Sequence, residues 1–545
     1  MDFFGSSRFT DHVNALMAEH HVPGISVGIA VGDSATAARG FGFASVERNE
    51  PCTPETVFDV ASSAKSLTAA AVALLVDDNK NHPKVQYDAT MSALLADDFV
   101  MPETHYTDGV TVEDVLSHRT GMASHDNSYM GTYAAQPDDA RSITRNLRNL
   151  AVAAPLRSRY LYCNMMYTAA THLVEVESGM PFARFLEDRF FNPLGMNSTA
   201  LQPALARERG LGDRIAKGHL WNKTSYDEFD SPDCPEGQGA GSVMSSAADF
   251  IKWVKALMNR EFPINDKVYQ GLTRMRSIVN PGAKRLKQHT TPAIYAAGME
   301  VCYYRGQMLV GHDGNIAGFG SRFVFLPEKR LGVVVMGNSS GAGALSTAVI
   351  RALVDEVLGL PASERQLRTK PKEKKLPTRP AAVSVNVTTE NAGDKGSYAM
   401  APGTKKKQAR NAGKPVDATS KASANERKAE KPSKKKARSL PPQEVPLDAY
   451  IGTFTNIGYK NLTVEMKDEA LFVDACDRAF GFTLSFEHKR HQREYIAHLC
   501  DALEGGDDPM DAEFVFEDDR AVRLGLDLEP AIRDLIWFDL VRDAE

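Results

Sequence analysis

The stretch "FDVASSAKSLTAAAVALL", residues 58–75, places two serines, a lysine and a third serine at the start of an apolar run. Apolar residues follow at the i, i+4, i+7 and i+8 spacing that predicts one buried face of a helix: Leu67, Ala71, Leu74 and Leu75. Ser62 and Lys65 are three residues apart, so on the first turn their side chains lie on the same side. An amine so placed can take the proton of a serine nucleophile. Serine is also a preferred N-cap residue, so a purely structural role for Ser62 stays open at this point.

Length and composition indicate a large globular protein. The chain has 545 residues, 43% apolar and 25% charged, which predicts about two to four domains. The net charge of −6 gives no general attraction to nucleic acid. The N-terminus "MDFFGSSRFTDHV" lacks the pattern of a signal peptide, and no apolar run is long enough to span a bilayer. The six cysteines include no CxxC pair, so we expect neither disulfides nor a zinc site, no metal or other cofactor, and a cytoplasmic location.

One part of the chain is strongly basic. Residues 364–438 hold 21 Lys or Arg against 7 Asp or Glu and almost no large apolar side chains. Such a composition cannot bury enough surface to offset chain entropy, so we expect a disordered basic linker over residues 361–443. The piece "KPSKKKAR" leaves a nuclear-import or polyanion-binding role open.

The segments on either side of this linker have different patterns. In residues 1–360, strand patterns at both ends ("GISVGIAVG", "SRFVFLP" and "RLGVVVMGN") enclose a largely helical middle. We expect an α/β domain in which the two ends share one antiparallel sheet, flanked by helices, with the helical region inserted. Residues 444–545 contain closely spaced short strand patterns, which predict a small antiparallel β-barrel domain.

Several serines compete with Ser62 as nucleophile. Ser433 and Lys436 also fit S-x-x-K, which shows that this motif alone is weak. Ser26 in "GISVG" and Ser339 in "GNSSG" fit the G-x-S-x-G nucleophile elbow. The strand alternation continues through Ser26 without a turn. After Ser339 an elbow enzyme needs a histidine, and the next one, His488, belongs to the second domain.

Two further motifs favour Ser62. Tyr162-Cys163-Asn164 stands about a hundred residues after it, and His312-Asp313-Gly314 stands shortly before the last strands of the first domain. The order S-x-x-K, Y-x-N and basic residue-x-Gly resembles the serine β-lactamase and penicillin-binding-protein superfamily. It is most similar to the branch of class C β-lactamases and D-aminopeptidase-like esterases, which includes the serine peptidases of family S12. The barrel looks like the lipocalin-like C-terminal module of some members.

The resemblance implies a role for each matching residue. Ser62 is the acylated nucleophile, and Lys65 is its proton acceptor, which requires a lowered lysine pKa. Tyr162 shares the proton transfer.

The resemblance also implies the substrate-binding groups. Asn164 holds the substrate's acyl-side amide or carbonyl, and His312 and Gly314 lie on an edge strand. The backbone N–H groups of Asn315 and Ser62 form the oxyanion hole. Cys163 is expected to be a buried filler, and His118 a structural turn residue.

One departure bears on the substrate. β-Lactamases usually carry Lys where this chain has His312, and a mostly neutral imidazole holds a carboxylate less well than an ammonium group does. We therefore expect a serine hydrolase or acyltransferase that acts on small-molecule or peptide substrates, namely esters, amides or β-lactam-like compounds. A catalytically inactive binding protein with the same cleft is the alternative, and a nucleic-acid scaffold using the basic linker is a weaker third. A homo-oligomeric state stays open.

Overall fold

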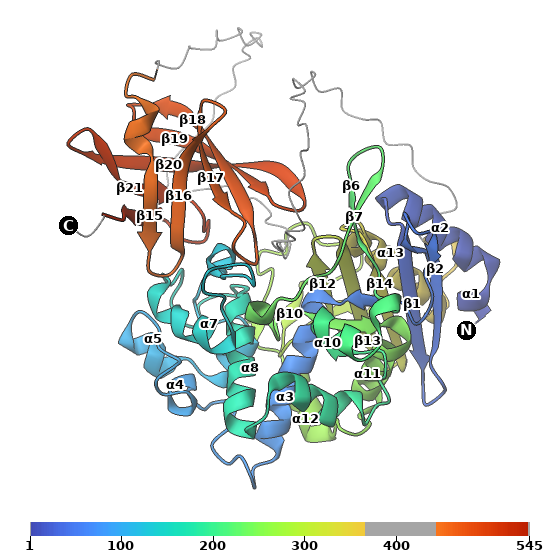
Figure 1. Ribbon diagram of the computed structural model, residues 1–545. Coiled ribbons are helices and arrows are strands. Elements are labelled where there is room, and N and C mark those ends of the chain that lie inside the picture. The colour runs from blue at the N-terminus through green and yellow to red at the C-terminus, as the bar shows by residue number, and fades with distance from the viewer. Residues whose placement is uncertain (1, 366–442, 543–545) are drawn as a thin grey trace, which may run out of the picture.

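The structure, a computed structural model, describes residues 2–365 and 443–542 (Figure 1). The predicted basic linker, residues 361–443, falls almost wholly on residues 366–442 and so lies outside the described residues. The same holds for the competing motif at Ser433 and Lys436.

A nine-stranded antiparallel sheet forms the centre of the first described range. Its spatial order is β3 (Glu50–Pro51), β2 (Ala37–Ser45), β1 (Gly24–Val31), β14 (Leu331–Gly337), β13 (Phe319–Leu326), β12 (Gln307–Ile316), β11 (Glu300–Tyr304), β10 (Ile294–Tyr295) and β9 (Ser277–Ile278). Strand β1 pairs with β14, from Ile25 opposite Gly337 to Val31 opposite Leu331. The prediction that both ends of this domain share one sheet is confirmed.

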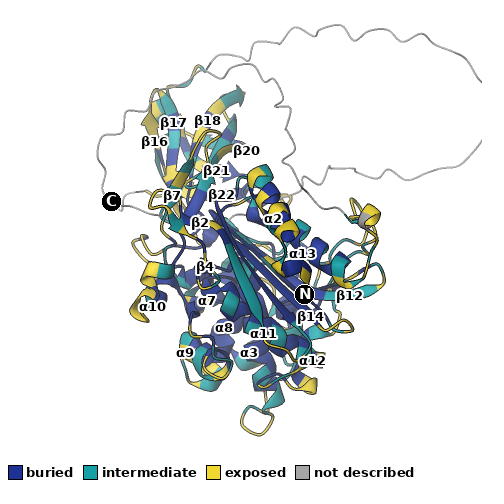
Figure 2. Ribbon diagram, turned by 90° about the vertical axis from the view of Figure 1, so that its right-hand side faces the viewer, coloured by how far each residue is buried: buried dark blue, intermediate teal, exposed yellow. Residues whose placement is uncertain are grey.

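Helices cover both faces of this sheet, and Figure 2 shows its strands as largely buried. Helices α2 (Ser7–His20) and α13 (Ala342–Val357) pack on one face with Ile25, Val27 and Ile29 of β1. Helix α11 (Ala247–Asn259) packs on the other face, where Gly28 leaves room for its backbone. The period of two in β1 therefore supplies two cores, one on each side of the sheet.

The helical region lies on the side of the sheet that α11 covers. It contains the segment of residues 58–75. This region also contains a small sheet of three short strands, in the order β4 (Val57–Asp59), β8 (Val243–Ser246) and β5 (Ala200–Leu201). The helices are α3 (Lys65–Asp77), α4 (Met91–Leu94), α5 (Thr104–Gly109), α6 (Val112–Leu116), α7 (Ala140–Asn146), α8 (Asn164–Ser178), α9 (Phe182–Leu186), α10 (Pro203–Glu208) and α12 (Asp266–Thr273). Helices α3 and α8 pack against each other in the middle of this region.

The second described range forms a closed barrel of eight antiparallel strands, as predicted. They are β15 (Gly452–Asn456), β16 (Lys460–Lys467), β17 (Ala470–Ala475), β18 (Phe482–Arg490), β19 (Glu494–Asp501), β20 (Gly505–Glu517), β21 (Arg520–Leu526) and β22 (Ile536–Leu540). Figure 1 shows the barrel against the end of the helical region near α7. One continuous apolar cluster contains buried residues of both parts, such as Leu150 and Tyr459.

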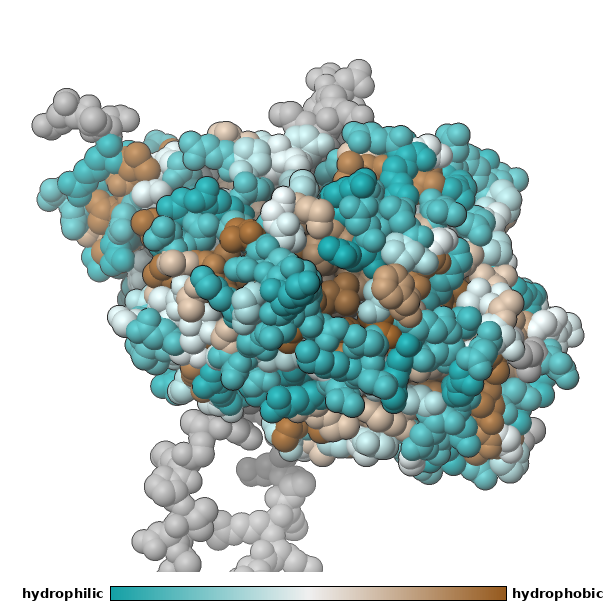
Figure 3. All heavy atoms as spheres, turned by 90° about the horizontal axis from the view of Figure 1, so that it is seen from below, coloured by the Kyte–Doolittle hydropathy of each residue, from teal (hydrophilic) through white to brown (hydrophobic). Residues whose placement is uncertain are grey.

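The outer surface is largely polar where Figure 3 displays it, with hydrophobic residues gathered near the middle of that face. Within residues 2–365 and 443–542, none of the helices combines the length and the apolar character needed to cross a membrane.

Candidate active site

Ser62 lies in a short turn immediately before α3. This turn is the 3-10 helix η1 (Ala61–Ala64), so the α-helix begins at Lys65, and Ser62 lies in the turn before it rather than on the first α-helical turn as predicted. Ala61 has a φ of 45°, a left-handed conformation that is uncommon for a residue other than glycine. Its backbone N–H donates to Asp59 Oδ1 at 2.7 Å. This local hydrogen bond helps to hold the strained turn that presents Ser62.

Lys65 is fully buried, and its amine contacts three oxygens. Nζ lies 3.1 Å from Ser62 Oγ, 2.8 Å from Asn164 Oδ1 and 2.7 Å from the carbonyl oxygen of Ala240. Burial lowers the pKa of Lys65 to about 7, against the opposing effect of the nearby Asp126 carboxylate. A large fraction of this lysine is therefore neutral at physiological pH and able to accept a proton.

Tyr162 approaches Ser62 from the loop before α8. Its hydroxyl donates to Ser62 Oγ at 2.8 Å, and its ring lies 4.8 Å from Lys65 Nζ. Burial raises the pKa of Tyr162 well above its usual value, so the phenol stays protonated at neutral pH.

Asn164 is the first residue of α8, and its side-chain amide joins Lys65 to a loop carboxylate. Oδ1 accepts from Lys65, and Nδ2 donates to Asp126 Oδ1 at 3.2 Å. An amide has two N–H donors, so the bond to Asp126 leaves one for another acceptor.

Strand β12 passes close to the serine at Gly314. A Cβ at this position would stand 2.2 Å from the Val60 carbonyl oxygen and 3.0 Å from the Ser62 nitrogen, so only glycine fits. The side chain of Asn315 lies on the other face of β12, since its Oδ1 is near α13, and only its backbone can face Ser62.

One prediction about β12, its position in the sheet, needs correction. It was expected to be the edge strand, but it lies between β11 and β13 in the sheet. Its register with β11 ends at Gly311, so within the described strands residues 312–316 pair with β13 alone, and this half of the strand is open toward the serine.

His312 shares the face of Gly314, and both of its ring nitrogens have partners. Nε2 lies 2.8 Å from the Tyr295 hydroxyl, and Nδ1 contacts the carbonyl oxygen of Asp313. A carbonyl can only accept, so Nδ1 carries the proton and Nε2 accepts from Tyr295. Burial lowers the pKa of His312 to about 4, which leaves the imidazole neutral at pH 7.

The competing serines lie elsewhere in the sheet. Ser26 is buried within β1 and donates to the Thr53 carbonyl oxygen at 2.6 Å. Ser339 follows β14 and donates to the His21 carbonyl oxygen at 2.9 Å. Neither serine is brought to Lys65, whereas Ser62, Tyr162 and Asn164 all are.

The sequence did not single out several residues of this site. Asp126, Tyr295 and the carbonyl of Ala240 belong to loops or short strands without a periodic pattern. His118, expected as a turn residue, has a φ of 55° and is buried. Its Nδ1 accepts from the Cys163 N–H at 3.1 Å, and its ring centroid lies 4.3 Å from that of Tyr162. It therefore packs beside the proposed proton donor as well as forming the turn.

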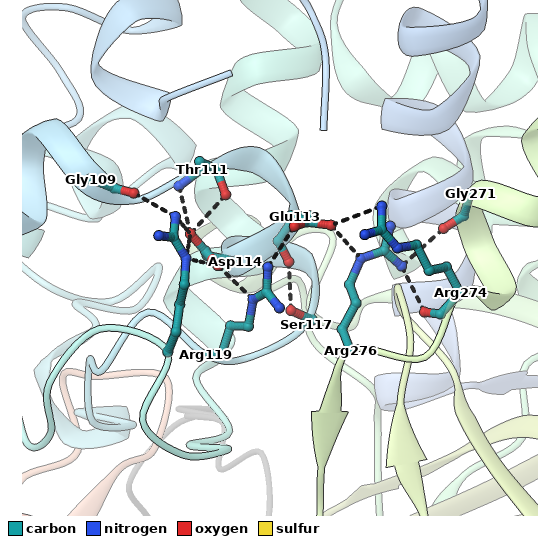
Figure 4. Close-up of polar contacts among 10 residues, drawn as sticks. Gly109, Thr111, Glu113, Asp114, Ser117, Arg119, Gly271, Arg274 and Arg276 are labelled. Carbon is teal, nitrogen blue, oxygen red and sulfur yellow. Dashed lines mark hydrogen bonds and ion pairs between the residues drawn. The ribbon is translucent and has the colours of Figure 1, made fainter. Parts of the chain in front are cut away.

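An ion-pair network includes Arg119, the residue that follows His118 (Figure 4). Asp114, in α6, accepts from Thr111 and from both Arg119 and Arg157. Burial opposes ionisation of Asp114, but the hydrogen bonds from Arg157 and Thr111 outweigh it and lower its pKa. Glu113 binds Arg119 on one side and Arg276 on the other. The backbone N–H groups of Arg157 and Leu161 donate to the carbonyl oxygens of Arg119 and His118, both at 2.8 Å, so the network is joined to the loop that leads to Tyr162.

Within the residues that the structure describes, no cluster of three or more histidine, cysteine or carboxylate side chains could hold a metal ion.

Sequence comparison shows which known families and proteins this chain is similar to. The model of a family described as "Beta-lactamase" matches residues 9–356, and that of a "Domain of unknown function (DUF3471)" matches residues 434–539. An unguisins hydrolase of Aspergillus campestris is 34% identical over 66% of this chain and 66% of its own length. A D-aminopeptidase of Brucella anthropi is 24% identical over 67% of this chain and 65% of its own length. The matches thus span just under two thirds of these relatives.

A solved structure resembles the whole chain. The octameric penicillin-binding protein homologue from Pyrococcus abyssi aligns with 98% of this chain and 99% of its own, with a TM-score of 0.54 and 19% identity. At this identity the likeness concerns the fold alone.

Proposed function

Because this chain belongs to the beta-lactamase family, whose model matches residues 9–356, we propose that it is a serine hydrolase that forms an acyl-enzyme on Ser62. One observation carries the proposal: Ser62 Oγ lies 3.1 Å from the amine of a fully buried lysine and 2.8 Å from a protonated phenol. We retain residues 1–360, 361–443 and 444–545 as the proposed domain, linker and barrel boundaries.

In the first step Ser62 Oγ attacks the carbonyl carbon of the substrate. A neutral Lys65 has two N–H donors and one lone pair. With the donors on Asn164 Oδ1 and the Ala240 carbonyl, the lone pair faces Ser62 and takes its proton. Tyr162 passes its proton to the leaving oxygen or nitrogen and is reprotonated from Lys65. The carbonyl–leaving-group bond breaks, which leaves the acyl group on Ser62.

In the second step water attacks the acyl carbon by the same route in reverse. Lys65 takes a proton from the water, the bond between the acyl carbon and Ser62 Oγ breaks, Oγ receives the proton, and the free acid is released. If another nucleophile replaces water, the same steps give acyl transfer. An acyltransferase is therefore the alternative to a hydrolase within this proposal.

The backbone N–H groups of Ser62 and Asn315 are proposed to stabilise the oxyanion. The close approach of β12 at Gly314 supports this, since the missing side chain lets the strand lie against the Ser62 nitrogen. Asn164 is assigned to the acyl-side carbonyl through its second N–H. Neutral His312 supports esters and uncharged amides or peptides over substrates that carry a carboxylate, such as β-lactams.

A cytoplasmic location is proposed with this reaction. The six cysteines are all free thiols, which supports a reducing compartment.

The test is turnover of a panel of neutral esters and amides by the full chain. Ser62→Ala should lower kcat by several powers of ten, whereas Ser339→Ala should leave it unchanged. A chain that binds these compounds in calorimetry but turns none of them over would favour the alternative, a binding protein with the same cleft.

A further inference from the structure

Loop residues 124–131 lie between the barrel and the reactive centre, and the barrel supplies much of their hydrogen bonding. Asp477 O accepts from the Gly131 N–H at 3.0 Å, and the Ala479 N–H donates to Tyr129 O at 3.1 Å. Arg478, 1% exposed, donates to Asn127 O at 3.1 Å. This loop is therefore held from outside its own domain.

Glu529 of the barrel contacts the two residues directly before Asp126. Its Oε2 accepts from Ser124 Oγ at 2.7 Å and from the His125 N–H at 2.9 Å. The carboxylate is 4% exposed, so these hydrogen bonds form away from bulk water. They fix the two residues directly before Asp126.

His125 is fixed by its side chain as well. Its φ of 48° is in the left-handed region, a conformation that needs support from its surroundings. Nε2 lies 2.8 Å from Ala151 O, so it carries the proton, and Nδ1 accepts from the hydroxyl of Tyr459 in the barrel at 2.7 Å. Two barrel side chains, those of Glu529 and Tyr459, thus fix the conformation of the residue directly before Asp126.

Asp126 in turn orients the amide that contacts the lysine. An asparagine amide can be turned either way, and here the carboxylate accepts from Nδ2, which directs Oδ1 to Lys65 Nζ at 2.8 Å. If Asp126 moved, only the hydrogen bond from Lys65 itself would favour that orientation, and the lone pair of Lys65 would be directed less firmly toward Ser62.

We propose that Glu529 of the C-terminal barrel is a positioning residue for the reactive centre, acting through Ser124, His125 and Asp126 on Asn164 and Lys65. This inference rests on the proposed function, because it assumes that Lys65 takes the proton of Ser62. The barrel then contributes to the rate of acylation and is not functionally independent of the first domain.

The experiment compares full-length chains for the rate at which a fluorophosphonate labels Ser62, separated into kinact and KI. In Glu529→Gln an amide nitrogen replaces one carboxylate oxygen, either Oε2, which accepts from Ser124 and His125, or Oε1, which accepts from the Ala531 N–H at 3.1 Å, so a donor now faces a donor on one side. We expect kinact to fall about tenfold, as for a misplaced catalytic group, with KI and the final labelling stoichiometry unchanged. A loss of folded protein would instead lower the stoichiometry.

Glu504→Gln is the matched control. Glu504 is also a barrel carboxylate that accepts from a serine of the first domain, Ser340, but this contact lies after β14 and away from Lys65. Its kinact should equal that of the parent chain. If Glu529→Gln labels with reduced stoichiometry, Ser124→Ala decides, since it removes one of the hydrogen bonds that Glu529 accepts; its kinact should fall at least about threefold.

The outcomes separate the two proposals. The role of Glu529 alone would be overturned if the parent chain labels on Ser62 and Glu529→Gln has the parental kinact. Where Ser124→Ala decides, a parental kinact of that variant would overturn it in the same way. An equal fall in Glu504→Gln would also overturn it, because the effect would then be general to the interface. A parent chain that is not labelled on Ser62 would overturn the proposed function itself, and this role with it.

Discussion

At Lys65, burial and a nearby negative charge act on the same pKa in opposite directions. Removal from water disfavours the ammonium ion, while the Asp126 carboxylate favours it. Burial prevails and brings the pKa to about 7. A lysine so tuned can accept a proton from Ser62 and later return it, which a solvated lysine cannot do at neutral pH.

The first prediction concerns the pH dependence of this lysine. Its pKa lies below the ordinary 10.5, so the neutral form that acts as base predominates only above about pH 7. We expect kcat/KM to fall about tenfold for each pH unit below 7 and to level off above it. Lys65→Arg, which cannot give up its proton, should be almost inactive at every pH.

The control for this prediction is Lys252→Arg, at a partly exposed lysine paired with Asp249. It should keep the parental profile. Near-normal activity of Lys65→Arg, or an acidic limb centred near pH 10, would remove Lys65 from the chemistry.

The second prediction concerns His312. Lysine at this position would add a charge-assisted hydrogen bond for a substrate carboxylate, worth about 1.5–3 kcal/mol. His312→Lys should therefore shift the ratio of kcat/KM for β-lactams over neutral esters upward by about 10- to 100-fold at pH 7.5. An unchanged ratio would mean that residue 312 does not face the substrate.

At the scale of elements, the sequence predicts the helices and strands whose apolar residues recur with a regular period. Alternation in β1 and β14 and the apolar face after Ser62 depend on local period, and these elements form as expected. The three motifs also come together, because the sheet and α8 bring Tyr162, Asn164 and Gly314 to Ser62. Two local details differ: the 3-10 turn before α3, and the interior position of β12. Both depend on contacts with distant segments, which no local pattern records.

The third prediction concerns the approach of β12 to η1. In Gly314→Ala the new methyl group would stand 2.2 Å from the Val60 carbonyl oxygen, so β12 must move away from Ser62. Loss of one oxyanion donor should lower kcat about 100- to 1,000-fold.

Gly212→Ala is the control, because its added Cβ would meet its nearest neighbour, Arg207 Cγ, at 3.6 Å, an ordinary contact. It should leave kcat unchanged. A Gly314→Ala enzyme with parental kcat would show that β12 supplies no oxyanion donor.

At the scale of the whole molecule, the barrel and the first domain share one apolar core and a set of buried polar contacts. The sequence predicts the barrel but not these contacts, since Ser124 and Glu529 are 405 residues apart and belong to segments without periodicity. We also predict that the barrel limits the size of the acyl acceptor, which is tested by comparing the selectivity between small and bulky esters.

The fourth prediction concerns the attachment of the barrel at Arg478. Its guanidinium donates to the buried carbonyl of Tyr459 and to the partly buried carbonyls of Asn127 and Asn461, and Arg478→Ala would leave these acceptors without that donor. We expect the thermal unfolding midpoint to fall by about 5–10 °C. The exposed ion pair of Arg523 with Asp539 provides the control, and Arg523→Ala should change the midpoint little. Equal small shifts in both variants would mean that Arg478 does not hold the barrel in place.

The measurement that tests the central claim most directly is the site of covalent labelling. The full chain is treated with a fluorophosphonate, digested, and mapped by mass spectrometry. We predict one label per chain, on the peptide that contains Ser62, absent from Ser62→Ala and retained by Ser339→Ala. Labelling on Ser339, or undiminished labelling of Ser62→Ala, would contradict both the nucleophile and the mechanism derived from it.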